Sequence, residues 1–140
     1  MLRILAFDVG EKRIGVAVSD PLGITAQGIE TYTRSDSLEQ DVSHLIQLAN
    51  SYQPVKILFG MPRNMDGSYG MQADITREFA NAVLEKWSGE HAFQDERLST
   101  ASARRVLLEA DMWRDKRKQV IDKIAAVFIL QSYLDAHGNT

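Results

Sequence analysis

The sequence predicts a single α/β domain built on a mixed five-stranded sheet: an antiparallel meander of three strands, two parallel strands, and helices on both faces. Apolar runs rich in β-branched residues dominate the start of the chain, and after them short apolar runs alternate with segments of helical period. With 140 residues, no internal repeat and no linker of biased composition, one domain is expected over residues 1–140.

The first two strands flank a short polar turn. Ile4–Phe7 and Ile14–Val18 are apolar, and the turn between them contains Gly10, which indicates a β-hairpin. The weaker pattern of Gly23–Thr33 is interpreted as the third strand of the meander. Asp8 comes where the first strand ends, so its carboxylate either bonds N–H groups of the turn or emerges from the sheet into a site. In the second case, Gly10 gives the backbone room to approach a phosphate or a metal.

From Ser37 the period changes. Apolar residues recur at helical spacing over Leu38–Tyr52, with Ser35 or Asp36 available as the N-cap and Pro54 as the stop. The remaining elements are expected in the order strand, helix, strand, helix, helix, over Val55–Phe59, Gln72–Trp87, Ala92–Glu96, Thr100–Ala110 and Gln119–Ala136. The charged segment Met112–Lys118 is predicted to be a loop.

The composition restricts the chemistry. The chain has no cysteine, which excludes disulfides and thiolate sites. No apolar run approaches the ~20 residues of a membrane-spanning helix, and no leader precedes the first strand, so a cytoplasmic protein without a membrane partner is expected. The net charge is −3, yet the segment from Arg97 to Lys123 holds eight basic and four acidic side chains. Such a segment on an acidic body suits binding of a polyanion.

Acidic residues lie where a site is expected. Asp8 and the Asp95–Glu96 pair fall at strand ends, where open α/β sheets bind ligands. Because strand side chains alternate, the two acids of the pair cannot both face the same side. Asp122 stands near the start of the last helix, with alanines three and four residues on that allow close approach to the sheet. Its alternative roles are a dipole-stabilised helix-terminal acid or a salt bridge to Lys118 or Lys123.

We predict that Asp8, Glu96 and Asp122 converge as catalytic residues that hold Mg²⁺ or Mn²⁺. Ligand sets made only of oxygen select such hard cations. Two ions about 3.5–4 Å apart would activate an attacking water and stabilise the leaving oxygen of a phosphodiester. Whether one or two ions bind is left open.

Four blocks of the chain resemble the YqgF/RuvX family: DVGEKRIGVAVSD at 8–20, GMPRNMDGS at 60–68, DERLST at 95–100 and VIDKIAAVFILQSYLD at 120–135. The resemblance covers essentially the whole chain, with departures at Ser99, where threonine is frequent, and at Arg63, where an apolar residue is usual. Members of the family are described as Holliday-junction resolvases and as nucleases for the ends of pre-16S ribosomal RNA. The resemblance implies an RNase H-like fold and catalytic acids at Asp8, Glu96 and Asp122.

Basic and hydroxyl side chains near these acids are predicted to bind nucleic acid. Arg97 either orients the neighbouring carboxylate or holds a phosphate with two hydrogen bonds. The basic stretch ahead of Asp122 is interpreted as a mobile loop that becomes ordered on nucleic acid, although a solvated charged face is the commoner role of such a run. Asp66 is assigned to ordinary turn chemistry. The predicted contact set is Lys12, Arg13, Asn64, Arg97, Ser99, Thr100, Arg104, Arg105, Lys116, Arg117 and Lys118.

The sequence leaves three functions open. The first is a metal-dependent nuclease that processes the 5′ end of pre-16S ribosomal RNA in ribosome biogenesis. The second is a resolvase of branched DNA, which would call for two symmetric active sites, although the sequence shows no dimer interface and a monomer or weak homodimer is expected. The third is a non-catalytic nucleic-acid-binding module. A phosphotransferase is disfavoured because Val16 stands where a P-loop has its lysine.

Overall fold

The computed structural model describes residues 3–62, 66, 68–95 and 114–137, with the side chains of 114–121 excepted. Its five strands form one sheet in the order β3-β2-β1-β4-β5. β1 (Ile4–Val9), β2 (Arg13–Ser19) and β3 (Ala26–Thr33) form an antiparallel meander. β4 (Lys56–Met61) pairs in parallel with β1, and β5 (Glu90–Asp95) pairs in parallel with β4. The predicted mixed sheet is confirmed.

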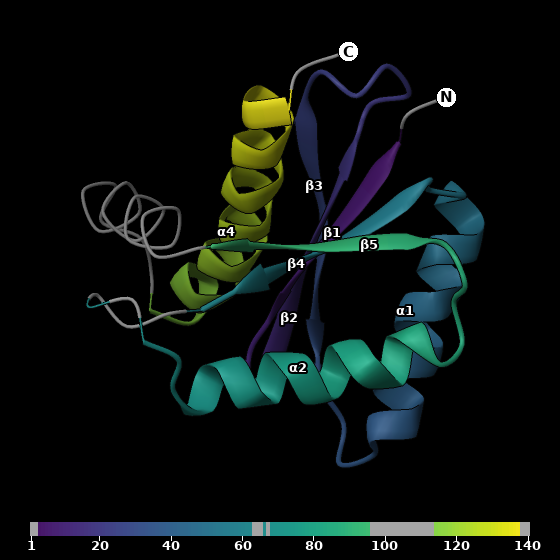
Figure 1. Cartoon of the computed structure of the whole chain (residues 1–140). Helices are drawn as coiled ribbons and strands as arrows, with labels where there is room; N and C mark the ends of the chain where they lie inside the picture. Colours follow the sequence, from purple (N-terminus) through teal and green to yellow (C-terminus); the bar gives the residue numbers. More distant parts are fainter. Residues whose placement is uncertain (1–2, 63–65, 67, 96–113, 138–140) are drawn as a thin grey trace.

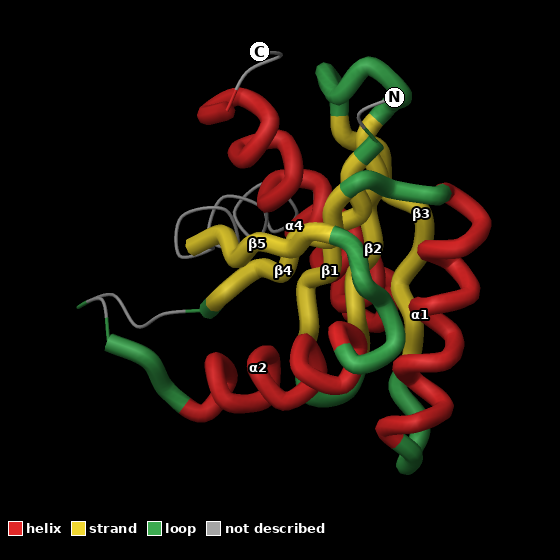
Figure 2. The backbone as a smooth tube through the Cα atoms, turned by 45° about the vertical axis from the view of Figure 1, so that its right-hand side comes forward, coloured by secondary structure: helices red, strands yellow, loops and turns green. Residues whose placement is uncertain are grey.

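Helices cover both faces of this sheet. α1 (Leu38–Tyr52) and α2 (Met71–Leu84) lie on one side, and α4 (Arg114–His137) lies on the other, mainly over β2, β3 and β1 (Figures 1 and 2). The helix expected over Thr100–Ala110 falls outside the described residues. Within the described part of the chain, no helix has the length and apolar character required to cross a membrane.

The two faces of the sheet are packed with side chains of different size. The face toward α1 and α2 buries large side chains, among them Phe7, Phe59 and Phe79. The face toward α4 buries small ones from β1 and β2, Ala6 and Ala17, against the alanine and leucine residues of the helix. Alternation along each strand separates these two sets. A helix can therefore approach the sheet more closely on the α4 side.

The start of α1 differs from the expected cap. The N-cap is Ser37, whose hydroxyl accepts a hydrogen bond from the amide of Gln40 at 3.2 Å. The prediction of Ser35 or Asp36 was wrong, because the Ser35 hydroxyl donates instead to the carboxylate of Asp41 at 2.9 Å. At the other end, Gln53 takes a left-handed conformation with φ 48° and closes the helix before the proline, as expected.

α4 begins earlier than the sequence pattern suggested. The prediction of a loop over Met112–Lys118 was wrong for residues 114–118, because the helix starts at Arg114. Lysine, arginine and glutamine are good helix formers, so a charged segment without an apolar stripe can form the first turns of a helix. The absence of hydrophobic period therefore did not indicate a loop here.

Candidate active site

Asp8 lies on the sheet face that α4 covers. Its neighbours on β1 alternate: Phe7 and Val9 belong to the core beneath α1 and α2, whereas Ala6 belongs to the core beneath α4. Asp8 shares the parity of Ala6, so its half-buried side chain is on the α4 face near the end of the strand. The sequence prediction of a carboxylate at the end of the first strand agrees with this position.

Gly15 brings α4 to the same place. It is the residue of β2 that stands opposite Asp8 in the antiparallel ladder. A Cβ atom built on Gly15 would overlap the backbone oxygen of Asp122, so the helix backbone rests directly on this glycine. Ala125 and Ala126, one turn further along α4, are fully buried. Close contact between helix and sheet therefore brings the backbones that carry Asp8 and Asp122 together.

Arg13 occupies the gap between the hairpin and α4. Its Nε donates to Oδ2 of Asp122 at 2.7 Å, and about a quarter of each side chain is exposed. The sequence offered Lys118 or Lys123 as alternative ion-pair partners of Asp122; among the side chains that the structure describes, its partner is Arg13. Arg13, which is predicted to contact nucleic acid, donates to a proposed metal ligand in this structure.

The turn that carries Arg13 is short and closed by its own backbone. The amide of Gly10 donates to the carbonyl of Arg13 at 2.9 Å, and a Cβ atom on Gly10 would lie 2.7 Å from that oxygen. Glycine is thus required here by the turn itself, a simpler reason than the approach of a ligand. Lys12, at the tip of this turn, is exposed.

The other predicted site residues are only partly described. Asp95 shares the parity of Phe93, which stacks on Phe59 with ring centroids 5.6 Å apart, so Asp95 is on the face opposite Asp8. Asp66 accepts hydrogen bonds from the amide and hydroxyl of Ser68, which confirms its turn chemistry. The following lie outside the described residues or have undescribed side chains: Glu96, Asn64, Arg97, Ser99, Thr100, Arg104, Arg105, Lys116, Arg117 and Lys118.

Among the described residues no group of three or more acidic or histidine side chains is placed to share a metal ion. This is the expected result when one of three predicted ligands, Glu96, is not described. The described part of the site is the pair Asp8 and Asp122 with Arg13 beside it.

A buried acid that no sequence pattern indicates lies on the other face of the sheet, in α1. Asp41 of α1 is only 1% exposed. Burial alone would raise the pKa of Asp41, but hydrogen bonds from Ser35, Tyr32 and Arg34 to its carboxylate hold that pKa below its usual value. Hydropathy periodicity could not identify this residue, because it occupies a core-facing position that a helical pattern would assign to an apolar side chain.

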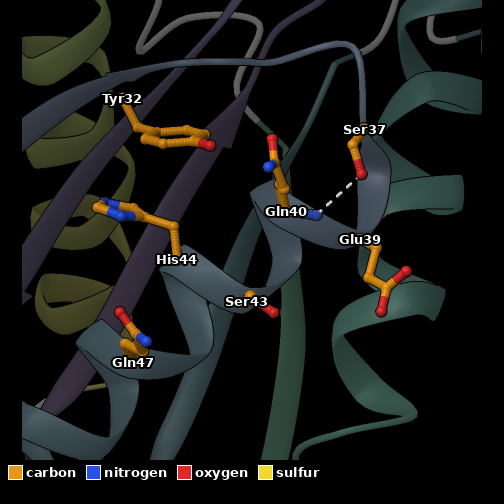
Figure 3. A pocket seen from close by; sticks show the side chains of 7 residues that line it. All are labelled: Tyr32, Ser37, Glu39, Gln40, Ser43, His44 and Gln47. Carbon is orange, nitrogen blue, oxygen red and sulfur yellow. Dashed lines mark hydrogen bonds between the residues drawn. The ribbon is translucent and has the colours of Figure 1, made fainter.

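A polar groove on α1 is separate from the Asp8 site. It has a volume of about 450 Å³, and its lining residues are Tyr32, Ser37, Glu39, Gln40, Ser43, His44 and Gln47 (Figure 3). The rings of Tyr32 and His44 stack at 4.3 Å, and His44 Nε2 lies 2.9 Å from a carboxylate oxygen of Glu30. Because α1 and α4 cover opposite faces of the sheet, this groove does not contribute to the Asp8 site.

The family model described as RuvX, Holliday junction resolvase, matches residues 2–136 of the chain. The chain belongs to the RuvX family. Curated relatives named "Putative pre-16S rRNA nuclease" include one from Syntrophomonas wolfei, 53% identical over 96% of this chain and 94% of the relative. Another, from Clostridium tetani, is 45% identical over 99% of both chains.

The solved structures that are similar to this RuvX chain include RuvC of Thermus thermophilus. In complex with a Holliday junction, RuvC superposes with a TM-score of 0.62 at 10% identity over 98% of this chain and 97% of RuvC. A second structure of RuvC gives a TM-score of 0.57. At this identity the likeness concerns the fold, and it confirms the RNase H-like architecture expected from the sequence.

Proposed function

We propose that this RuvX chain is a nuclease that hydrolyses phosphodiester bonds of structured RNA with a divalent metal, acting in the cytoplasm on the 5′ end of pre-16S ribosomal RNA. The observation that carries the proposal is the direct contact between the backbone of α4 and Gly15. Gly15 is paired with Asp8 in the sheet, and the α4 residue that it contacts is Asp122. The names of the curated relatives support the RNA substrate.

The acidic residues beside the contact between α4 and Gly15 fit a hard cation. Both described acids offer carboxylate oxygens, the ligands that Mg²⁺ and Mn²⁺ prefer. Arg13 engages Oδ2 of Asp122, so Oδ1 can serve as the cation ligand, and Glu96 is proposed as the third acid. When bound, the ions would activate water and stabilise the leaving oxygen.

The chain's own contribution is to hold charge and position. Arg13 offsets the negative charge of Asp122, which reduces the repulsion between two neighbouring carboxylates. Lys12 is exposed beside it, where an ammonium group can approach a substrate phosphate. The basic residues at 116–118 are proposed to contact the nucleic-acid backbone, which would make binding depend steeply on salt.

A cleavage assay tests the proposal. The full chain is incubated with a 16S ribosomal RNA fragment that carries its 5′ extension, with Mg²⁺, with Mn²⁺ and with EDTA. We expect metal-dependent cleavage that Asp8→Asn, Glu96→Gln and Asp122→Asn each abolish. Asp74→Asn is the matched control, because Asp74 is a highly exposed acid on α2, on the other face of the sheet. Cleavage that persists in EDTA and in all three site variants would refute the mechanism.

The same assay with a four-way DNA junction tests the second candidate, a Holliday-junction resolvase. The description of the matching family model favours it. Resolution requires paired cuts by two active sites, so paired cleavage of the junction by a dimeric form would support this function over RNA processing. A third outcome would indicate a binding module. In that case the native chain binds either substrate without cleaving it, and Asp8→Asn binds equally well.

A further inference from the structure

The buried carboxylate of Asp41 gathers four hydrogen bonds. Its Oδ1 accepts from the Tyr32 hydroxyl at 2.8 Å and from the amide and hydroxyl of Ser35, each at 2.9 Å. Its Oδ2 accepts from Nε of Arg34 at 3.2 Å. A buried charge is costly unless it is paired and hydrogen-bonded, and this one is satisfied on both oxygens. The cluster therefore fixes the position of the arginine.

Arg34 extends from this cluster to the hairpin turn. Its Nη1 donates to the carbonyl of Gly10 at 3.0 Å, and its backbone amide donates to the carbonyl of Lys12 at 2.9 Å. The guanidinium also lies over the ring of Phe79 in α2, 5.2 Å from its centroid. Arg34 thus links both helices of one face to the turn that follows Asp8.

One residue of the proposed site stands on each side of this turn. Asp8 comes two residues before Gly10. Arg13, where the turn ends, donates a hydrogen bond to Asp122 of α4 on the other face of the sheet. The hydrogen bond from Nε to Asp41 joins Arg34 to the start of α1. The hydrogen bond from Nη1 to the carbonyl of Gly10 joins the same guanidinium to the turn, and so limits movement of the turn.

We propose that Arg34 and Asp41 are a positioning pair that holds the Gly10–Arg13 turn, and through it Asp8 and Arg13, in the arrangement that binds the divalent cation. The inference rests on the proposed function of the Asp8 site. Residues that orient metal ligands are commonly worth about 10–100-fold in metal affinity. We therefore expect the same range when the tie to the turn is removed.

The test measures the affinity of the full chain for Mn²⁺ alone, by calorimetry and by the electron paramagnetic resonance signal of free Mn²⁺. Arg34→Met keeps an apolar stem against Phe79 and removes every guanidinium hydrogen bond. Tyr32→Phe is the matched control, because it removes one hydrogen bond from Asp41, retains the ring that stacks on His44 (Figure 3) and leaves the bond to Gly10 in place. We expect Mn²⁺ affinity to fall about 10–100-fold in Arg34→Met and to stay near the native value in Tyr32→Phe.

Two further measurements separate positioning from folding. Circular dichroism and urea unfolding establish whether each variant is folded. If Arg34→Met does not fold, Arg34→Lys takes its place, because lysine retains the charge but lacks the planar group that bridges two acceptors. Native Mn²⁺ affinity in the folded Arg34 variant overturns the inference. A parallel loss in both variants that follows their loss of stability also overturns it, in favour of a structural role. If the native chain itself does not bind Mn²⁺, the proposed function fails and this inference with it.

Discussion

Gly15 determines how closely α4 can approach the sheet, and Gly15→Ala tests that role. A methyl group at this position would overlap the backbone oxygen of Asp122 and crowd the amide of the next residue. Backbone atoms cannot rotate away as a side chain can. The helix would therefore have to lift from β2 by at least about 1 Å to restore ordinary packing distances.

The expected magnitude follows from this displacement. Overpacking of a buried site commonly costs about 1–3 kcal/mol of folding free energy. Part of this cost is offset because alanine is better tolerated than glycine inside a strand. A misplacement of ~1 Å in a catalytic site can reduce turnover about 10²-fold. We therefore expect a variant that still folds, is less stable by about 1–3 kcal/mol, and cleaves RNA about 10²-fold more slowly.

Urea unfolding followed by circular dichroism, together with the metal-dependent cleavage assay, measures both quantities. Gly28→Ala is the matched control, because Gly28 lies in β3 under the same helix but its added Cβ atom would meet the side chain of Lys123, at 2.7 Å, instead of backbone. A lysine side chain can change rotamer, so the control should cost less. This role of Gly15 is refuted if Gly15→Ala retains native stability and native cleavage, or if both glycine variants behave alike. Either result would mean that activity does not depend on the close contact between α4 and Gly15.

Three other measurements follow from particular contacts. Because the pKa of Asp41 in the folded chain lies below its unfolded value of about 3.9, the stabilisation from this carboxylate is complete above about pH 4 and is lost as the pH falls through the folded-state pKa. Urea unfolding at a series of acidic pH values should show a shallower decline in Asp41→Asn than in the native chain. Ser37→Ala removes the N-cap of α1 and should cost about 1 kcal/mol in the same urea assay; an unchanged midpoint would contradict the capping role. Replacing the three basic residues at 116–118 by glutamine should reduce the slope of log K against log salt for RNA binding by up to about 2–3, whereas an unchanged slope would mean that they do not contact phosphates.

The order of strands and helices was predictable because it depends on local patterns. Apolar alternation and the change of period at Ser37 are properties of neighbouring residues. All five expected strands and three of the four expected helices occur close to where they were placed, and the fourth helix lies outside the described residues. The start of α4 was not predictable from such patterns. Its first turn is charged and has no apolar stripe, so its helical state reflects intrinsic helix propensity.

The contacts that form the site were less predictable, because they join distant parts of the chain. The two alanines after Asp122 correctly indicated a close approach of the last helix to the sheet. Its counterpart, Gly15, looked like an ordinary residue of a strand, and the partner of Asp122 is Arg13, 109 residues away. Nearby lysines were possible partners from sequence, but the contact of α4 with β2 places the carboxylate of Asp122 beside the hairpin.

The difference between the two faces of the sheet gives a physical reason for the place of the proposed site on the α4 side. Large rings fill the space beneath α1 and α2, and they hold those helices away from the strands. On the other face Ala6, Gly15 and Ala17 leave little volume to fill, so α4 contacts the strand backbone directly. An aspartate has only one methylene group between its backbone and its carboxylate. Two such short side chains can bind the same ion only where helix and strand backbones nearly touch, which is the arrangement that the small residues of this face produce.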